Sequence, residues 1–223
     1  MNVNQEYFHE TEAYTSEKER LKVAWELLSY ANMIFRRVYV FEHFDAFSKS
    51  FRSDPPIEYW NGMQYEKLID QIKICIAFEN YNKAFLLSSG FMVHMIDSKK
   101  NGGLSKKQKS EPILIEEFLN GNKFIQNSPF TEWYLDGLNN FNTLPFGWTL
   151  SEGYQSIIKL DIRFLNYLKD VNQKRNRLHF YKNYHGAFRV ETLLENLAFA
   201  KSYGTDLIVK ELKRHDVLLK EFD

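Results

Sequence analysis

The fold is decided by one long stretch in the first half of the chain, residues 64–97, which reads QYEKLIDQIKICIAFENYNKAFLLSSGFMVHMID. Its apolar side chains recur at intervals of three and four residues, which is the spacing that an α-helix brings onto one side. They cover more than one face, and a helix of that kind is surrounded by other elements. The stretch therefore predicts a long helix at the centre of a helical fold.

Three further long helices are expected from the same spacing, over residues 16–50, 152–181 and 190–221. Ser16 begins the first of them, and Glu19 follows at the spacing of a capping box. Long helices joined mostly by short connections pack as a bundle. The sequence shows no internal repeat and no convincing alternation of apolar and polar residues that would indicate a strand. We therefore predict an all-α bundle of four or more long helices.

Glycines lie within two of these predicted helices. Gly90 costs a helix about 1 kcal/mol relative to alanine, and the apolar pattern resumes after it. We expect it to allow close helix packing rather than to end the helix. Gly204 marks a point at which the last helix can be interrupted.

The pattern weakens between the second and third predicted helices. Residues 98–109 are rich in glycine and lysine, which favours a solvated surface loop and leaves open a basic flap over a phosphate backbone. A short helix is expected near residues 113–119, followed by turn-rich sequence. We interpret residues 103–153 as a loop-rich insertion in a single domain that spans residues 1–223.

Composition restricts the environment and the partners. A hydrophobic content of 44% in 223 residues suffices for a real core, and an aromatic content of 16% argues against disorder. Cys75 is the single cysteine, which excludes an intramolecular disulfide and a cysteine-based zinc cluster. This favours a reducing compartment, and we expect the cytoplasm. The formal net charge is zero, so any binding to nucleic acid must depend on a local patch.

Several classes of site and location are not expected. The chain has no secretory signal pattern at its N-terminus and no apolar run long enough to span a membrane. It lacks a glycine-rich phosphate loop, a dinucleotide fingerprint, a His-Glu-x-x-His motif and a calcium loop. Its six histidines do not fall at zinc-ligand spacing. We therefore expect neither a metal nor a cofactor.

A polar segment near the end of the third predicted helix carries the strongest chemical signal. On a helix, Arg175 and His179 continue the stripe that contains Leu165 and Leu168, so both point toward protein rather than open solvent. Arginine grips a phosphate with a planar fork, and histidine exchanges protons near neutral pH. The pair can therefore act on one phosphodiester. The alternative is an arginine paired with a carboxylate such as Asp161 and a histidine hydrogen-bonded in the core.

Two helices carry a family resemblance. The sequence Arg-Asn-Arg-Leu-His-Phe of residues 175–180 resembles the signature of the HEPN (higher eukaryotes and prokaryotes nucleotide-binding) family, and residues 78–94 resemble its earlier helix with a glutamate, a lysine-alanine pair, a glycine and a histidine. Three residues separate Arg175 from His179, where the family pattern has a longer interval. Counting from Lys174 restores that interval, with lysine in place of arginine.

The resemblance implies a HEPN-like bundle that cleaves RNA without a metal ion, often as a homodimer. It implies catalytic roles for Arg175 and His179, with Asn176 orienting the phosphate or a neighbour. Further residues are expected to bind RNA, because lysine and arginine neutralise phosphate and aromatic rings stack on bases: Lys174, Arg177, Tyr181 and Lys182. Glu79 and Lys83 are either supporting residues behind the catalytic pair or, as we prefer, a plain surface ion pair.

Three functions remain in view at this point. The first is a HEPN endoribonuclease that acts as a toxin or as a defence or stress effector, with an antitoxin or another regulatory protein as a partner. The second is a non-catalytic HEPN-like module that binds RNA, nucleotide or a protein. The third is a purely structural helical dimer. His94, on the apolar central helix, is expected to be a hydrogen-bonded core residue in each of them.

Overall fold

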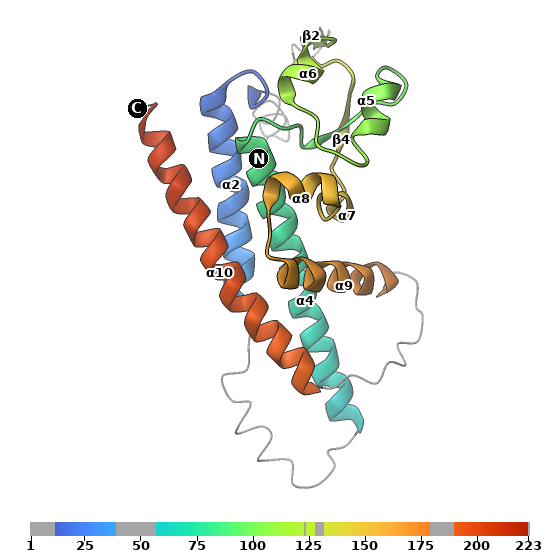
Figure 1. Ribbon diagram of the computed structural model, residues 1–223, viewed down its shortest axis with the longest axis vertical. Helices are drawn as coiled ribbons and strands as arrows, with labels where there is room; N and C mark the ends of the chain where they lie inside the picture. Colours follow the sequence, from blue (N-terminus) through green and yellow to red (C-terminus); the bar gives the residue numbers. More distant parts are fainter. Residues whose placement is uncertain (1–11, 39–56, 123, 128–131, 179–189, 223) are drawn as a thin grey trace.

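The computed structural model describes residues 12–38, 57–122, 124–127, 132–178 and 190–222. These residues are mostly helical, which confirms the prediction of a helical protein (Figure 1). They also form two small sheets of two strands each. Within the described part of the chain, no helix combines the length and the apolar character that crossing a membrane requires.

Three long helices lie side by side and form the body of the molecule: α2 (Glu17–Arg36), α4 (Ile57–Ser88) and α10 (Val190–Lys220) (Figure 1). Helix α2 packs against both of the others. A fourth helix, α9 (Ile162–Leu178), crosses α4 on the side away from α2. The long α4 thus lies between α2 on one side and α9 on the other, as its apolar faces predicted.

Helix α2 begins where the sequence predicts and ends earlier. The Ser16 hydroxyl accepts a hydrogen bond from the Glu19 backbone N–H at 3.4 Å, as expected for a helix cap. The helix ends at Arg36, and the Lys73 ammonium donates to the Arg37 carbonyl oxygen at 2.9 Å. The predicted extension to residue 50 is therefore wrong for residues 37 and 38, and residues 39–50 lie outside the described residues.

Helix α4 ends at Ser88, because Gly90 adopts the left-handed conformation with φ +83°. No atom lies within 4 Å of the position that a Cβ would take there, so close packing is not the reason for this glycine. The expectation that the helix continues to residue 97 is wrong. The chain instead turns into the short strand β1 (His94–Ile96).

The predicted insertion contains more regular structure than expected. Strand β4 (Leu138–Thr143) pairs antiparallel with β1, and His94 lies opposite Thr143. The short helix expected near residues 113–119 is present as α6, but the absence of strands was wrong. The remaining elements of this region are α5 (Gly102–Lys107), α6 (Ile115–Leu119), β2 (Phe124–Asn127), β3 (Glu132–Leu135) and α7 (Phe146–Thr149).

The third predicted helix is divided into two. Helix α8 (Glu152–Ile158) ends at Lys159, whose φ of 58° is left-handed, and α9 begins at Ile162. The Asp161 carboxylate accepts hydrogen bonds from the backbone N–H groups of Arg163 and Phe164 at 2.9 and 3.2 Å. Asp161 therefore caps the start of α9 rather than lying within the helix.

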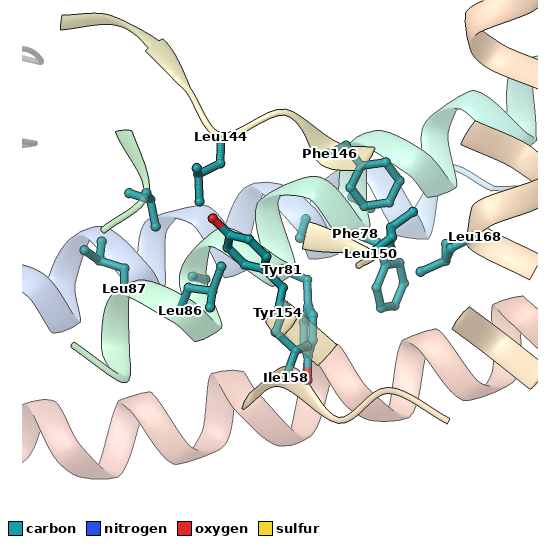
Figure 2. Close-up of a cluster of buried hydrophobic side chains, with 14 of the residues drawn as sticks. Phe78, Tyr81, Leu86, Leu87, Leu144, Phe146, Leu150, Tyr154, Ile158 and Leu168 are labelled. Carbon is teal, nitrogen blue, oxygen red and sulfur yellow. The ribbon is translucent and has the colours of Figure 1, made fainter. Parts of the chain in front are cut away.

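Aromatic rings fill the centre of the bundle. Phe78 of α4 lies 5.6 Å from the Phe35 ring of α2 and 4.6 Å from the Phe164 ring of α9, measured between ring centroids. Gly204 does not interrupt α10; a Cβ at this position would lie 2.5 Å from the Phe35 ring, so the glycine admits that ring. Figure 2 shows how side chains of the β4–α8 region, among them Leu144 and Tyr154, cover the next part of α4.

Candidate functional site

Arg175 lies in the second half of α9 and is directed at α4. The preceding turns of its helix bury Leu168 and Val171, which fixes the side of α9 that faces the bundle. Arg175 Nη1 donates to Glu79 Oε2 of α4 at 3.3 Å. The side chain keeps 31% of its surface exposed, so it lies at the edge of the core and remains accessible.

Glu79 connects two cations. Its Oε1 accepts from Lys83 Nζ at 2.8 Å, one helical turn along α4, while its Oε2 accepts from Arg175. Lys83 also donates to the Thr143 hydroxyl at 2.7 Å. The Lys83 side chain is only 9% exposed. The interpretation of Glu79 and Lys83 as a plain surface ion pair is therefore wrong, because both belong to a cluster that joins α4, α9 and β4.

We call Glu79, Lys83, Thr143 and Arg175 the charge cluster. Its sequence-predicted members are the two α4 residues and Arg175, which the fold brings together. The partner of Arg175 is a carboxylate, as one of the two readings of the sequence predicted, but it is Glu79 and not Asp161. Thr143 was not identified, because it lies in the region of weak pattern and a lone threonine there carries no signal.

A neighbouring hydrogen bond fixes the position of β4 and α7 against α4. The buried Asn82 amide donates from Nδ2 to Thr149 Oγ1 at 2.9 Å, and the Thr149 hydroxyl donates to the Phe146 carbonyl oxygen at 2.8 Å. Asn82 and Lys83 thus hold both ends of the segment that runs from β4 to α7. This segment forms one wall of the charge cluster.

Neutral groups lie beneath the cluster. Burial raises the pKa of the Cys75 thiol to about 12, against a smaller lowering by Arg175 and a smaller raising by Glu79. Burial also raises the pKa of the Tyr167 hydroxyl well above its usual value. Both groups are therefore uncharged near neutral pH, and Cys75 is not a thiolate nucleophile. The two cations and one carboxylate leave the cluster with one net positive charge.

The other predicted site residues are described only in part. Lys174 forms an ion pair with Asp170 on its own helix. Asn176 and Arg177 belong to α9, but their side chains lie outside the described residues. His179, Tyr181 and Lys182 lie outside the described residues altogether. Their predicted roles stay predictions.

His94 is a hydrogen-bonded core histidine, as predicted. Its ring Nδ1 lies 2.7 Å from the Tyr14 hydroxyl, which also accepts from the backbone N–H groups of Val93 and His94. It lies on strand β1 and not on a helix. The residue therefore ties the N-terminal segment to the sheet.

The charge cluster can bind an anion, because its guanidinium and its ammonium share a single carboxylate. The described residues contain no group of three or more histidine, cysteine, aspartate or glutamate side chains placed to hold a metal ion. Comparison of the chain with models of protein families, with curated proteins and with solved structures found no match.

Proposed function

We propose that this protein is a metal-independent endoribonuclease of the HEPN type. The observation that carries the proposal is the position of Arg175, which Glu79 holds at the edge of the core in the second half of α9. His179 follows four residues later in the sequence, one helical turn in a continued helix. An arginine that stabilises charge on the phosphate and a histidine that transfers a proton can together cleave a phosphodiester.

The proposed reaction is an attack by the ribose 2′-hydroxyl on the adjacent phosphorus. His179 takes the proton from this hydroxyl or gives one to the departing 5′-oxygen, and water serves the other of these two transfers. Arg175 stabilises the charge that develops on the phosphate oxygens. The bond between phosphorus and the 5′-oxygen breaks. The products carry a 2′,3′-cyclic phosphate and a 5′-hydroxyl. Asn176 orients the phosphate, and residues 174, 177, 181 and 182 contact the flanking RNA.

The proposal includes the biological setting that the family resemblance implies. The enzyme acts in the cytoplasm on cellular RNA as a toxin or as a defence or stress effector. A homodimer places two Arg175 and His179 pairs at one cleft, and an antitoxin or another regulatory protein restrains them.

A non-catalytic HEPN-like module is the second candidate, and a specific contact favours it. The Glu79 carboxylate already neutralises part of the Arg175 charge. The interval between Arg175 and His179 is also shorter than in the family pattern. Such a module would bind RNA, nucleotide or a protein partner at the same place without turnover.

The test is cleavage of a mixed RNA panel by the purified protein in EDTA. We expect cyclic-phosphate ends with the wild type and loss of cleavage in both Arg175→Ala and His179→Ala. Arg214→Ala is the matched control, because Arg214 is also paired with a carboxylate, that of Glu211 on α10. Folded wild-type protein that binds RNA without cleaving it would establish the module instead.

A further inference from the structure

Within the described part of the chain, two acceptors engage the buried ammonium of Lys83. A lysine has three N–H donors, and Glu79 and Thr143 accept from Lys83 at 2.8 and 2.7 Å. Among the described residues it has no third partner. Because its side chain is more than nine-tenths buried, a further acceptor that reaches it would be held with little competition from water.

Thr143 lies between the Lys83 ammonium and the surface of the molecule. The residue is exposed, and its hydroxyl oxygen accepts from Lys83 in a partly buried contact. A hydroxyl that accepts one hydrogen bond still has its own hydrogen to donate. Thr143 therefore has a donor to offer beside the Lys83 ammonium.

Arg175 completes the set of donors. Its guanidinium carries five N–H donors, and a single bond, to Glu79, engages it among the described residues. Lys83 and Arg175 contact the two oxygens of the same carboxylate, so the two cations lie close together. One net positive charge remains, which a phosphodiester with one negative charge would balance.

We infer that Lys83, Thr143 and the side of Arg175 nearest to them form a subsite for an RNA phosphodiester next to the one that is cleaved. This rests on the proposed function, in which His179 and Arg175 hold the scissile phosphate. Single-stranded RNA then runs from the end of α9 toward strand β4. Thr143 is a positioning residue in this arrangement, since it orients Lys83 as well as contacting the phosphate.

The subsite assigns a function to the region between β1 and α8. Its strand β4 supplies Thr143, and its helix α7 supplies Thr149, which is hydrogen-bonded to Asn82 of α4. The residues expected from the family resemblance to bind RNA are Lys174, Arg177, Tyr181 and Lys182. The inference adds Lys83 of α4 and Thr143 of β4.

The test uses a short single-stranded 2′-O-methyl oligoribonucleotide, which keeps the phosphates but has no free 2′-hydroxyl to attack. Binding is measured by fluorescence anisotropy over a range of salt concentrations. Thr143→Val should weaken binding about tenfold, because a hydrogen bond to a charged group is lost. Thr143→Ser, which keeps the hydroxyl, should bind as the wild type does.

The salt dependence of RNA affinity distinguishes the positioning role of Thr143 from the charge of Lys83. Lys83→Gln should reduce the slope of affinity against salt by about one counterion, whereas Thr143→Val should leave that slope unchanged. Thermal melting checks that each variant is folded. Equal binding by Thr143→Val and the wild type would overturn the subsite, and so would the absence of wild-type binding.

The outcome for the subsite is distinguishable from that for catalysis. Loss of 2′-O-methyl RNA binding in Thr143→Val together with no cleavage by the wild type would support the subsite and overturn the nuclease. Cleavage by the wild type with full binding by Thr143→Val would support the nuclease and overturn the subsite.

Discussion

Phe78 and Glu79 are neighbours on α4, yet they belong to two different regions of the molecule. Phe78 is fully buried among the rings of Phe35 and Phe164, which come from helices on either side. Glu79 lies at the rim and holds two cations. Adjacent positions of one helix, about 100° apart around its axis, therefore serve different purposes: one holds the bundle together, and the other is available for chemistry.

The two regions contribute to stability through different physics. Burial of an aromatic side chain is favourable in proportion to the apolar area removed from water. An ion pair at a partly buried site must first lose its hydration, which offsets much of the attraction between the charges. We call Phe35, Phe78 and Phe164 the ring cluster. We expect it to dominate the free energy of unfolding and the charge cluster to contribute little to it.

Phe78→Ala should give the largest effect. Removing a fully buried ring that three helices surround leaves a cavity, and we expect a loss of about 3–5 kcal/mol in the free energy of unfolding. Urea denaturation measures it. Phe85→Ala, at a partly buried position on the same helix, is the control and should cost less. Equal losses at the two positions would contradict the assignment of the core.

Gly204→Ala tests the same region from α10. The new Cβ would meet the ring of Phe35 at 2.5 Å and that of Phe78 at 2.9 Å, and both rings are held by their neighbours. We expect a loss of about 1–3 kcal/mol from overpacking, although alanine favours the helix itself. Gly103→Ala, where no atom lies within 4 Å of the added Cβ, is the control. A stabilised Gly204→Ala variant would show that the rings can move apart.

The sequence predicts the helices better than it predicts where they end. Helix α10 has the expected bounds because its apolar stripe is continuous and it packs along α2. Lys159 interrupts the third predicted helix because it adopts a left-handed conformation, which lysine rarely does and which no local pattern announces. Gly90 ends α4 although apolar residues follow, because its left-handed conformation turns the chain out of the helix toward strand β1.

Only part of the charge cluster could be predicted. Arg175 and Glu79 are visible in the sequence because each is a charge beside apolar residues of a helix. Their contact could not be inferred, since it depends on the angle at which α9 crosses α4. Thr143 could not be found at all, because its role comes from the pairing of β4 with β1 and from the length of the Lys83 side chain.

Glu79→Gln changes the charged residue that follows Phe78 on α4. Glutamine keeps the size and one acceptor but removes the charge, so the buried Lys83 loses its carboxylate. We expect a loss of about 1 kcal/mol in the free energy of unfolding, well below that of Phe78→Ala. RNA cleavage should fall at least tenfold, because Arg175 is no longer held. A variant with wild-type cleavage would show that Glu79 does not position the arginine.

Buried His215 should make the free energy of unfolding depend on pH. Its ring is fully buried in α10, with Nδ1 2.9 Å from the Glu211 carbonyl oxygen. Burial lowers the pKa of His215 below its usual 6.5. The hydrogen bond to the Glu211 carbonyl oxygen raises this pKa, and the nearby Arg214 lowers it, but burial has the largest effect. The unfolded chain therefore takes up a proton at a higher pH than the folded protein does.

The stability that neutral His215 contributes is thus complete above about pH 6.5 and is lost as the pH falls from there toward the lowered pKa. Melting temperatures of the wild type and His215→Leu, compared across this window, measure the effect. The wild type should lose more stability than the variant on acidification. Parallel curves would show that His215 carries no such linkage.

Arg175→Lys should give the smallest change in stability and still affect function. The position is partly exposed, and lysine keeps the positive charge, so we expect a change within about 0.5 kcal/mol in the free energy of unfolding. Lysine lacks the planar fork that can hold Glu79 with one edge and a phosphate with another. Cleavage should therefore fall about tenfold or more, measured under single-turnover conditions beside Arg214→Lys as the control. If Arg175→Lys cleaves RNA as the wild type does, a positive charge alone suffices at this position. The contact of Arg175 with Glu79 would then serve the fold, as the ring cluster does, and not the reaction.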